Sequence, residues 1–324
     1  AQETSNEEAR RTLTAQVEKE FYCLLAARTE IEIQRANLDL AQERYEQTRI
    51  DFENGRTSEL SMLQARVNAA NQEPAYLSTV NAYNRRRQNF LIVLGLDPLT
   101  EVRLEGDLTV DRIHVDATDL TAEYVHGRSD VQAQLATLEQ LRNQRNLTVA
   151  NGRTPTLTLS AGWSTAVTDP FEDASWEEDV WSDTATIGVR LSVPLDGFIP
   201  GSGTDVSIAD ATDRIDQGEI QLLEITDAAR TEIINLVDQL DTAWANIELA
   251  ELNIELARTA YEMSEEAYRR GTTELLDVDD SQQEYLSAQQ TYVTNQYEYL
   301  AGLIDLRVAL GVDEIPGKGV TDEN

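Results

Sequence analysis

Lysine is almost missing from this chain of 324 residues, in which Lys19 and Lys318 are the only two and arginine supplies the rest of the 26 basic residues. The acidic residues number 59, which gives a formal net charge of −33. Such an acidic surface repels nucleic acid and anionic lipid headgroups, which argues against both as partners. A composition with many acidic residues and almost no lysine resembles that of proteins adapted to high salt. A solvated acidic helical surface is the alternative explanation.

Cysteine and histidine are also scarce. Because Cys23 is the single cysteine, an intrachain disulfide and a cysteine zinc site are both excluded. His114 and His126 are the only histidines and lie in a stretch without periodicity, so we expect no metal site and no cofactor. The chain has no run of 18 apolar residues, and Ala1–Arg10 is too polar and acidic for a signal peptide.

Helix-breaking residues are rare, and their positions point to an internal repeat. Residues 7–54 contain no proline and no glycine, and their apolar side chains recur at helical spacing. Gly55 lies 216 positions before Gly271, and the same offset, without a gap, aligns further identical pairs: Tyr45/Tyr261, Tyr76/Tyr292, Tyr83/Tyr299 and Gly95/Gly311. Chance is not expected to place so many glycines and tyrosines in register, so we predict a duplication.

Each copy of the repeat predicts two long helices joined by a tight turn. The first helices cover residues 7–54 and about 206–270, and the return helices cover 60–94 and 276–310. A glycine ends each helix in the manner of a C′ residue. At 1.5 Å per residue, roughly 50–60 residues make a rod of about 75–90 Å. Alanine-rich rods with narrow apolar stripes suit antiparallel coiled coils.

The middle of the chain predicts a β-hairpin. Residues 156–167 and 184–195 each alternate apolar side chains with small polar ones, in the length and pattern of membrane-barrel strands. Trp163, Trp176 and Trp181 would lie in an interfacial belt. The alternative is a soluble hairpin packed on helices, but a lone hairpin is marginally stable and no other segment predicts long strands.

Three segments, taken in order, resemble the TolC family of outer-membrane efflux proteins over nearly the whole chain. "GRSDVQAQLATLEQLRNQRNLTVANGRTPTLTLSAGW" matches the family's opening motif, its helix and its first strand, with Ser129 in place of the usual proline. The residues that carry this match are Arg128, Asp130, Pro155, Leu157 and Leu159. "LSVPLDG" at 191–197 matches the close of the second strand, and "YRRGTTELLDVDD" at 268–280 matches the second coiled-coil tip.

The resemblance implies a mainly α fold with a β-hairpin, assembled as a trimeric duct. Long antiparallel coiled-coil helices would form a periplasmic α-barrel, and the strands would join an outer-membrane β-barrel. The implied partners are two further copies, a periplasmic adaptor protein and an inner-membrane pump. The implied function is passive export of drugs, metals or secreted proteins, in a tripartite efflux or type I secretion system, without enzymatic activity.

Two alternatives to this interpretation stay open at this point. The first is a soluble coiled-coil scaffold with an incidental hairpin. The second, a carboxylate enzyme, would need further converging polar groups that the sequence does not supply. The repeat also predicts that the first copy lacks a hairpin and its preceding helix, roughly 80–90 residues, through truncation or loss. Three such chains would supply six strands where the family uses twelve.

We divide the chain into five parts on this basis. They are a first-repeat helix pair at 1–97 with its tip at 54–60, a connecting segment at 98–127, a helix and hairpin at 128–205, a second-repeat helix pair at 206–311 with its tip at 270–276, and a tail at 312–324.

The resemblance assigns contact with the adaptor to the two tips. The residues concerned are Gly55, Thr57, Leu60, Gly271, Thr272, Thr273 and Leu276. Helix termination, with Ser or Thr as N-caps, is the alternative role for the same residues.

The resemblance also predicts an entrance gate. Asp277 and Asp280 lie three residues apart, on one helix face, and would form carboxylate rings that favour cations. Complementing the helix dipole is their alternative role. We expect Asp279, off that face, to be solvated or to complement the dipole. Tyr45, Tyr261 and Arg270 would brace the closed state.

Overall fold

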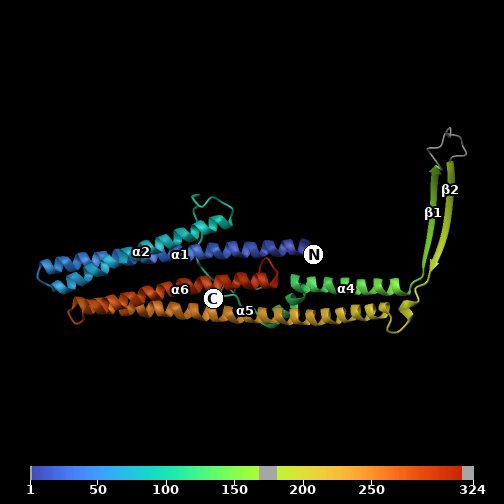
Figure 1. Ribbon diagram of the computed structural model, residues 1–324. Coiled ribbons are helices and arrows are strands. Elements are labelled where there is room, and N and C mark those ends of the chain that lie inside the picture. Colours follow the sequence, from blue (N-terminus) through green and yellow to red (C-terminus); the bar gives the residue numbers. More distant parts are fainter. Residues whose placement is uncertain (1, 168–180, 316–324) are drawn as a thin grey trace. The chain divides into compact units, whose positions relative to one another are not determined.

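The protein is described by a computed structural model that covers residues 2–167 and 181–315 (Figure 1). It divides into two compact units, one formed by residues 1–131 and 226–324 and the other by 132–225. Four long helices dominate: α1 (Gln2–Glu53), α2 (Glu59–Val93), α5 (Gly203–Arg269) and α6 (Leu275–Leu310). Their bounds lie within a few residues of the predicted ones, so the two helix pairs of the repeat are confirmed. No helix among the described residues is long and apolar enough to cross a membrane.

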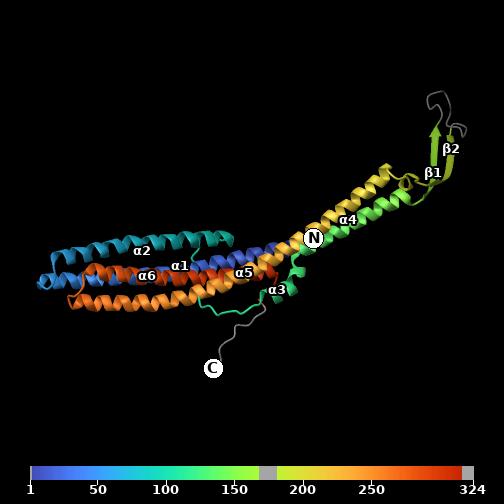
Figure 2. The same ribbon diagram turned by 90° about the horizontal axis from the view of Figure 1, so that it is seen from below.

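In the first unit, α1 packs along both α2 and α6, and Figures 1 and 2 both show α5 beside α6. Small side chains lie at these contacts, including the buried Ala41 of α1 and Ala65 of α2. Gly302 of α6 has a similar role, because a methyl group there would lie 2.9 Å from Leu240 Cδ2 of α5. Side chains this small let helix backbones approach closely, as the composition predicts for coiled coils.

The largest buried cluster joins α5 and α6 to a short helix in the connecting segment. The cluster contains Leu120, Val125, Ala229, Ile233, Val237, Leu240, Ile247, Tyr299, Leu306 and Leu310. Leu120 belongs to α3 (Ala117–Tyr124) and Val125 to the 3-10 turn η1 (Val125–Gly127). No helix was predicted within residues 98–127. A signal was present, because Asp116 precedes α3 as an N-cap and accepts a hydrogen bond of 2.6 Å from the Thr118 amide.

Polar contacts hold the rest of the connecting segment against the helices. The Tyr299 hydroxyl accepts a hydrogen bond from the Ile113 amide at 2.9 Å and donates one to the Asp111 carbonyl at 3.3 Å. Arg28 of α1 donates to the carbonyls of Leu104 and Gly106, at 3.0 and 2.7 Å. These bonds satisfy backbone groups that form no helix or strand.

Arg128, at the start of the segment that resembles the efflux family, ties that segment to α5 and α6. Its guanidinium pairs with Asp130 at 2.9 Å and with Glu232 of α5 at 2.8 Å. It also donates to the Ala309 carbonyl in the last turn of α6, at 3.1 Å. Burial acts against the charge of this arginine, but the two carboxylates prevail and raise its pKa. The arginine–acid motif is therefore a structural tie between helices.

The second unit contains most of α4 (Ser129–Arg153), the first part of α5 and a β-hairpin. Gly218, inside α5, lies against Leu138 of α4, and a methyl group at Gly218 would come within 2.8 Å of Leu138 Cδ2. The Gly218 carbonyl also accepts a hydrogen bond of 2.9 Å from the Gln134 side chain. A glycine inside a long helix thus marks a close approach of two backbones.

The hairpin pairs β1 (Thr156–Val167) with β2 (Trp181–Ser192) in antiparallel register, from Thr156 opposite Ser192 to Val167 opposite Trp181. The first predicted strand is confirmed, but the second, predicted at 184–195, was placed three residues too late. In this register Val193 would pair with Pro155, and neither Pro155 nor Pro194 has an amide proton to extend the ladder. The two prolines therefore end the pairing at Ser192.

Candidate functional site

The two helix tips have the same backbone geometry. Gly55 and Gly271 adopt left-handed conformations with φ of 72° and 73°. At the first tip the Gly55 amide donates to Phe52 and the Arg56 amide donates to Asp51, at 2.9 and 2.8 Å. The second tip has the equivalent bonds from the amides at 271 and 272 to the carbonyls at 268 and 267, at 2.9 and 3.0 Å. Both tips are Schellman motifs, as the C′ glycines predict.

The caps of the return helices differ between the tips. Ser58 caps α2, and its side chain accepts a hydrogen bond of 3.1 Å from the Ser61 amide. Glu274 caps α6 in a capping box with Asp277, whose carboxylate accepts from the Glu274 amide at 3.3 Å and from the Thr273 hydroxyl. These hydrogen bonds, that from Thr273 first, lower the pKa of Asp277 below its usual range. The N-caps are thus Ser58 and Glu274, not the threonines of the tips.

The residues predicted to contact the adaptor lie together at each tip and are largely accessible. Gly55, Gly271 and Thr272 are exposed, whereas Thr57 and Thr273 are half-buried. Leu60 and Leu276, which are equivalent in the repeat, expose 66% and 55% of their surface. Both tips thus expose a large apolar side chain at the same position of the repeat.

The two predicted gate residues, Asp277 and Asp280, are both exposed at the start of α6. Asp280 lies at a cavity of 510 Å³ between α2 and α6. Amide side chains dominate the lining of this cavity: Asn37, Gln64, Asn68, Asn71, Gln72, Gln282 and Gln283. Asp277 is engaged in its capping box, so the two carboxylates have different surroundings although they lie on one helix face.

Asp279 is not solvated, and that part of the prediction was wrong. Its side chain is 19% exposed and forms an ion pair of 3.0 Å with Arg44 of α1, which is 11% exposed. Burial raises the pKa of Asp279, and the Arg44 charge offsets only part of this effect. The alternation of polar and apolar residues along α6 could not reveal this position, because its partner lies 235 residues away.

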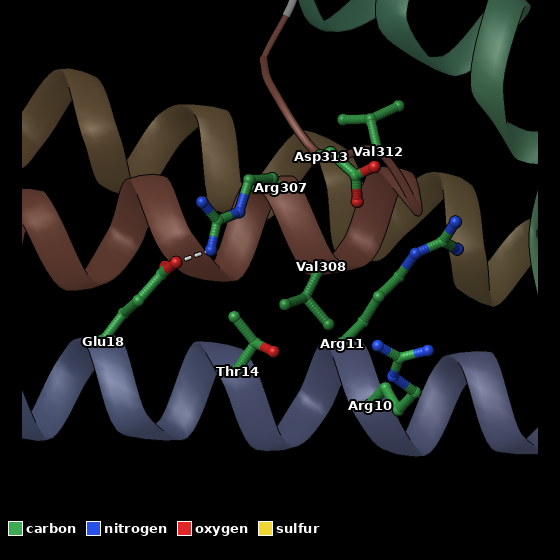
Figure 3. Close-up of a pocket in the computed structure, with 8 residues that line it drawn as sticks. All are labelled: Arg10, Arg11, Thr14, Glu18, Arg307, Val308, Val312 and Asp313. Carbon is green, nitrogen blue, oxygen red and sulfur yellow. Dashed lines mark hydrogen bonds and ion pairs between the residues drawn. The ribbon is translucent and has the colours of Figure 1, made fainter.

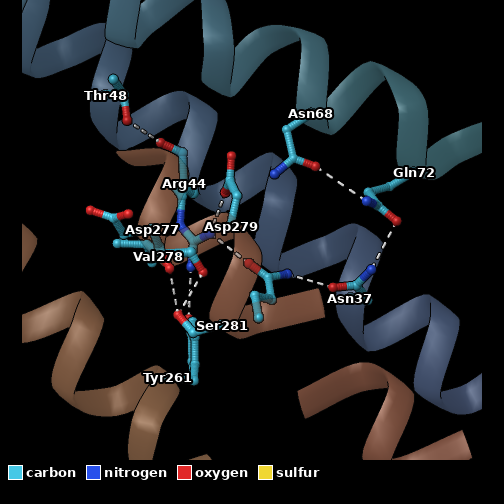
Figure 4. A network of polar contacts seen from close by, with 11 residues as sticks. Asn37, Arg44, Thr48, Asn68, Gln72, Tyr261, Asp277, Val278, Asp279 and Ser281 are labelled. Atoms are coloured by element: carbon cyan, nitrogen blue, oxygen red, sulfur yellow. Dashed lines mark hydrogen bonds and ion pairs between the residues drawn. The ribbon is translucent and has the colours of Figure 1, made fainter. Parts of the chain in front are cut away.

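Arg44 is the centre of a polar network that joins all four helices (Figure 4). Besides Asp279, it donates to the Gln282 side chain at 2.5 Å and to the Tyr261 hydroxyl of α5 at 2.8 Å. Gln282 in turn donates to Asn37 of α1, and Asn37 donates to Gln72 of α2 at 2.8 Å. Sequence reasoning missed Arg44.

Of the three predicted bracing residues, Tyr261 is part of this network. Its ring also stacks on that of Tyr285, with centroids 6.4 Å apart and an interplanar angle of 7°. Arg270, in contrast, is exposed in the turn after α5 and pairs at 2.7 Å with Glu266 of that helix. Tyr45 is half-buried on α1. The structure therefore brings Tyr261 together with Arg44 rather than with Arg270.

A second hollow, of 450 Å³, lies between the N-terminal part of α1 and the end of α6 (Figure 3). Arg10, Arg11 and Arg307 line it, and Arg307 pairs with Glu18. Arg11 lies against the α6 cap, because a methyl group at Gly311 would be 3.5 Å from its Nη1. Positive charge at this position complements the negative end of the helix dipole. Over the described ranges, no three His, Cys, Asp or Glu side chains are grouped to hold a metal ion.

The hairpin has one apolar and one polar face. Six large apolar side chains on one face are between 66% and 80% exposed: Leu157, Leu159, Trp163, Ile187, Val189 and Leu191. The Trp163 indole donates to the Thr165 hydroxyl at 3.2 Å, and Thr165 donates to Asp183 at 2.7 Å, so this face becomes polar beyond the tryptophan. Such a boundary suits the predicted interfacial position of Trp163. Trp176 and the Trp181 side chain lie outside the described residues.

Comparisons with solved structures find the same fold in outer-membrane channels. OprN is 20% identical with a TM-score of 0.75, and the match covers 95% of this chain and 68% of OprN. VceC from Vibrio cholerae is 20% identical with a TM-score of 0.74, covering 96% of this chain and 72% of VceC. For CusC the identity is 16%, the TM-score 0.79, and the coverage 96% and 70%. The predicted fold, mainly helical with one hairpin, is confirmed.

Sequence comparison identifies the family. No curated protein matches the chain significantly. The family model described as "Outer membrane efflux protein" matches residues 1–95 and 122–312, which is more than half of the chain. The chain therefore belongs to the outer membrane efflux protein family, a family of outer-membrane channels with a periplasmic helical part, and it is not an enzyme.

Proposed function

We propose that the chain is one subunit of a homotrimeric exit duct in a tripartite efflux or type I secretion system. The observation that carries this proposal is the hairpin, whose six exposed apolar side chains share one face while small polar residues occupy the other. Strands that face lipid on one side and water on the other have this pattern. Cargo of the classes drugs, metals or secreted proteins would pass through the duct without chemical change.

The tips support docking to a periplasmic adaptor protein, and through it to an inner-membrane pump. Leu60 and Leu276 are the exposed apolar residues beside two turns of equal geometry. A rigid turn that presents one leucine costs a partner little ordering entropy on binding. Leu60→Asp and Leu276→Asp should each weaken capture of the adaptor in a pull-down. Leu147 of α4 is also exposed but lies far along the chain from either tip, so Leu147→Asp is the control and should leave capture unchanged.

Asp277 and Asp280 are proposed as the gate of the duct. Their support is the exposure of both carboxylates on one helix face, together with the hydrogen bonds that keep Asp277 ionised. Three copies would bring six carboxylates to the entrance, where they attract cations. The first tip has Ser61 and Gln64 at the equivalent positions, so the charge comes from the second tip alone.

The Arg44 network is proposed to hold this entrance closed, because it ties α6 to α1 directly behind the two aspartates. Breaking it by Arg44→Met should raise the single-channel conductance. Arg49→Met is the matched control, since Arg49 lies on the same helix and pairs with Glu46 and Glu53 at the surface.

The experiment that tests the duct is extraction of the full chain from membranes, followed by planar-bilayer recording. We expect detergent-dependent trimers and cation-selective pores. Asp277→Ala with Asp280→Ala should weaken the cation preference and any block by multivalent cations. A monomer or dimer that needs no detergent would contradict the duct, and an unchanged ion preference would contradict the gate alone.

A further inference from the structure

The polar face of the hairpin has one charged residue among the residues of β1 and β2, and that residue is Arg190. Directly paired residues share a face, so Thr158, opposite Arg190, lies on the same side. The remaining residues of this face are small and neutral: Thr156, Ser160, Gly162, Ser164, Ala166, Ser182, Thr184, Thr186, Gly188 and Ser192. In a chain with 59 acidic and 26 basic residues, composition does not favour a lone arginine here.

Arg190 lies within the span of the apolar face. Its neighbours along the strand, Val189 and Leu191, are on the opposite side of the sheet and are 69% and 66% exposed. A charge at this height would be destabilising on the lipid side of a barrel strand, and the alternation of the strand directs Arg190 to the other side. The polar face is the one that would meet the water-filled interior.

The guanidinium of Arg190 is exposed and available for a ligand. Within the described part of the chain it has no ion pair or hydrogen bond, and its own face offers no carboxylate. Gly188 beside it and Thr158 opposite it are small, which leaves room for the long side chain. The arginine guanidinium presents a planar set of donors that matches carboxylate and phosphate groups.

We propose that Arg190, with its counterparts in two further copies, forms a guanidinium ring that binds oxyanions inside the duct. The ligands are carboxylate or phosphate groups, either carried by cargo or free in solution. This inference rests on the proposed trimeric duct and adds a site to it. Rings of arginine select anions, whereas the aspartates at the helix tips would select cations, so the duct would have sites of opposite preference.

The test uses trimers of the full chain in planar bilayers, with citrate or inorganic phosphate added to each side in turn. Both anions should reduce the current through the unmodified pore. Arg190→Gln should weaken this block about tenfold, because charge-assisted hydrogen bonds are lost, and should shift the reversal potential toward cations. Block by citrate alone would restrict the ring to carboxylate groups, and block by phosphate alone would restrict it to phosphate groups.

Two variants separate the loss of charge from a change in the interior surface. Thr186→Gln adds a long neutral side chain to the same face and should leave the block unchanged. Arg190→Lys keeps the charge but not the planar donor set, so it should keep the reversal potential and part of the block.

A chemical rescue guards against a variant that merely assembles poorly. Arg190→Cys in a Cys23→Ser background should lose the block, recover it with a cationic thiosulfonate reagent, and fail to recover it with a neutral one. Pores of Arg190→Gln that are blocked as strongly as the unmodified ones would overturn the ring and leave the duct intact. A chain that forms no pores would overturn the duct, and the ring with it.

Discussion

The turn at Gly55 and the turn at Gly271 end their helices with the same pair of backbone hydrogen bonds, yet the residues that follow them are chemically unlike. Ser58, Ser61 and Gln64 at the first tip become Glu274, Asp277 and Asp280 at the second, each 216 positions later. Helix termination depends on the glycine and on few other residues. The side chains beyond the turn can therefore differ without changing how the helices end.

The polar network extends this contrast between the repeats. Arg44 corresponds to Ala260 in the second copy, and Asp279 corresponds to Leu63 in the first. The ion pair between Arg44 and Asp279 therefore has no equivalent between the corresponding residues, Ala260 and Leu63. The two repeats thus differ at both ends of this ion pair: the first supplies the buried arginine and the second supplies the acidic tip, and the two meet where the proposed gate would be.

The largest expected effect comes from breaking the network with Arg44→Met. Removing the partner of a buried carboxylate costs about 3–5 kcal/mol, and the lower end applies here because Asp279 keeps some exposure. Urea unfolding in detergent, followed by circular dichroism, would measure the loss. Arg49→Met, at the surface of the same helix, should cost far less, because ion pairs in solvent contribute little. Equal losses in the two variants would mean that the network does not stabilise the fold.

The stability that Arg44→Met loses should depend on pH. Burial already raises the pKa of Asp279, and loss of Arg44 would raise it further. A carboxyl group whose pKa is raised on folding binds its proton more tightly in the folded state, so stability falls as pH rises through the folded pKa. We therefore expect Arg44→Met to lose more stability at about pH 8 than at about pH 5. A loss that grows on acidification would contradict this account.

The two tip glycines should give equal and smaller effects. Alanine at Gly55 or Gly271 would meet no atom within 4 Å, so the cost comes from the left-handed backbone alone, about 1–2 kcal/mol. Gly127→Ala is the control, because Gly127 also has open space around it but has no positive φ. Thermal unfolding of the three variants would compare them. A loss at one tip and not at the other would show that the turns are not equivalent.

Repeated and local features are the ones that could be predicted from the sequence. The four helices follow from a periodicity that lies within a few turns of chain, and their end glycines follow from comparing the sequence with itself at the offset of 216. The connecting segment was missed because α3 is only eight residues long, too short for a clear period. The end of β2 depends on the register with β1, in which two prolines stop the ladder.

The candidate site was predicted in its exposed part and, within the buried network, only at Tyr261. Asp277, Asp280 and the tip residues follow a motif that is contiguous in the chain. Arg44 could not be found in this way, because on α1 alone it is one more arginine in a polar stretch. Its burial and its bonds to Tyr261 and Asp279 exist only once α1 packs against α5 and α6.

Within the second tip, Asp277 should act on stability and Asp280 should not. The pKa of Asp277 is lowered from 3.8 by its hydrogen bonds, so its contribution is complete above that pH and is lost as pH falls through the folded pKa. Asp277→Asn should therefore flatten the decline of Tm below about pH 4, and Asp280→Asn, which leaves the capping box intact, should not change the Tm near neutral pH. Matching curves for the unmodified chain and Asp277→Asn would mean that the capping box does not form in solution.

The smallest expected effect comes from giving the first tip the cap of the second. Ser61→Glu would place an acidic side chain three residues after Ser58, in the arrangement of a capping box, where it can accept from the Ser58 amide. It also adds negative charge to the first turn of α2, at the positive end of the helix dipole. The gain should be about 0.3–1 kcal/mol, reduced by the loss of the contact between the Ser58 and Ser61 hydroxyls.

Ser61→Gln is the control, because it tests the hydrogen bond to the Ser58 amide without the added charge. If the glutamate variant is no more stable than the unmodified chain, the two tips do not differ in helix stability. The acidic residues of the second tip would then act on the ions and cargo that pass the proposed gate.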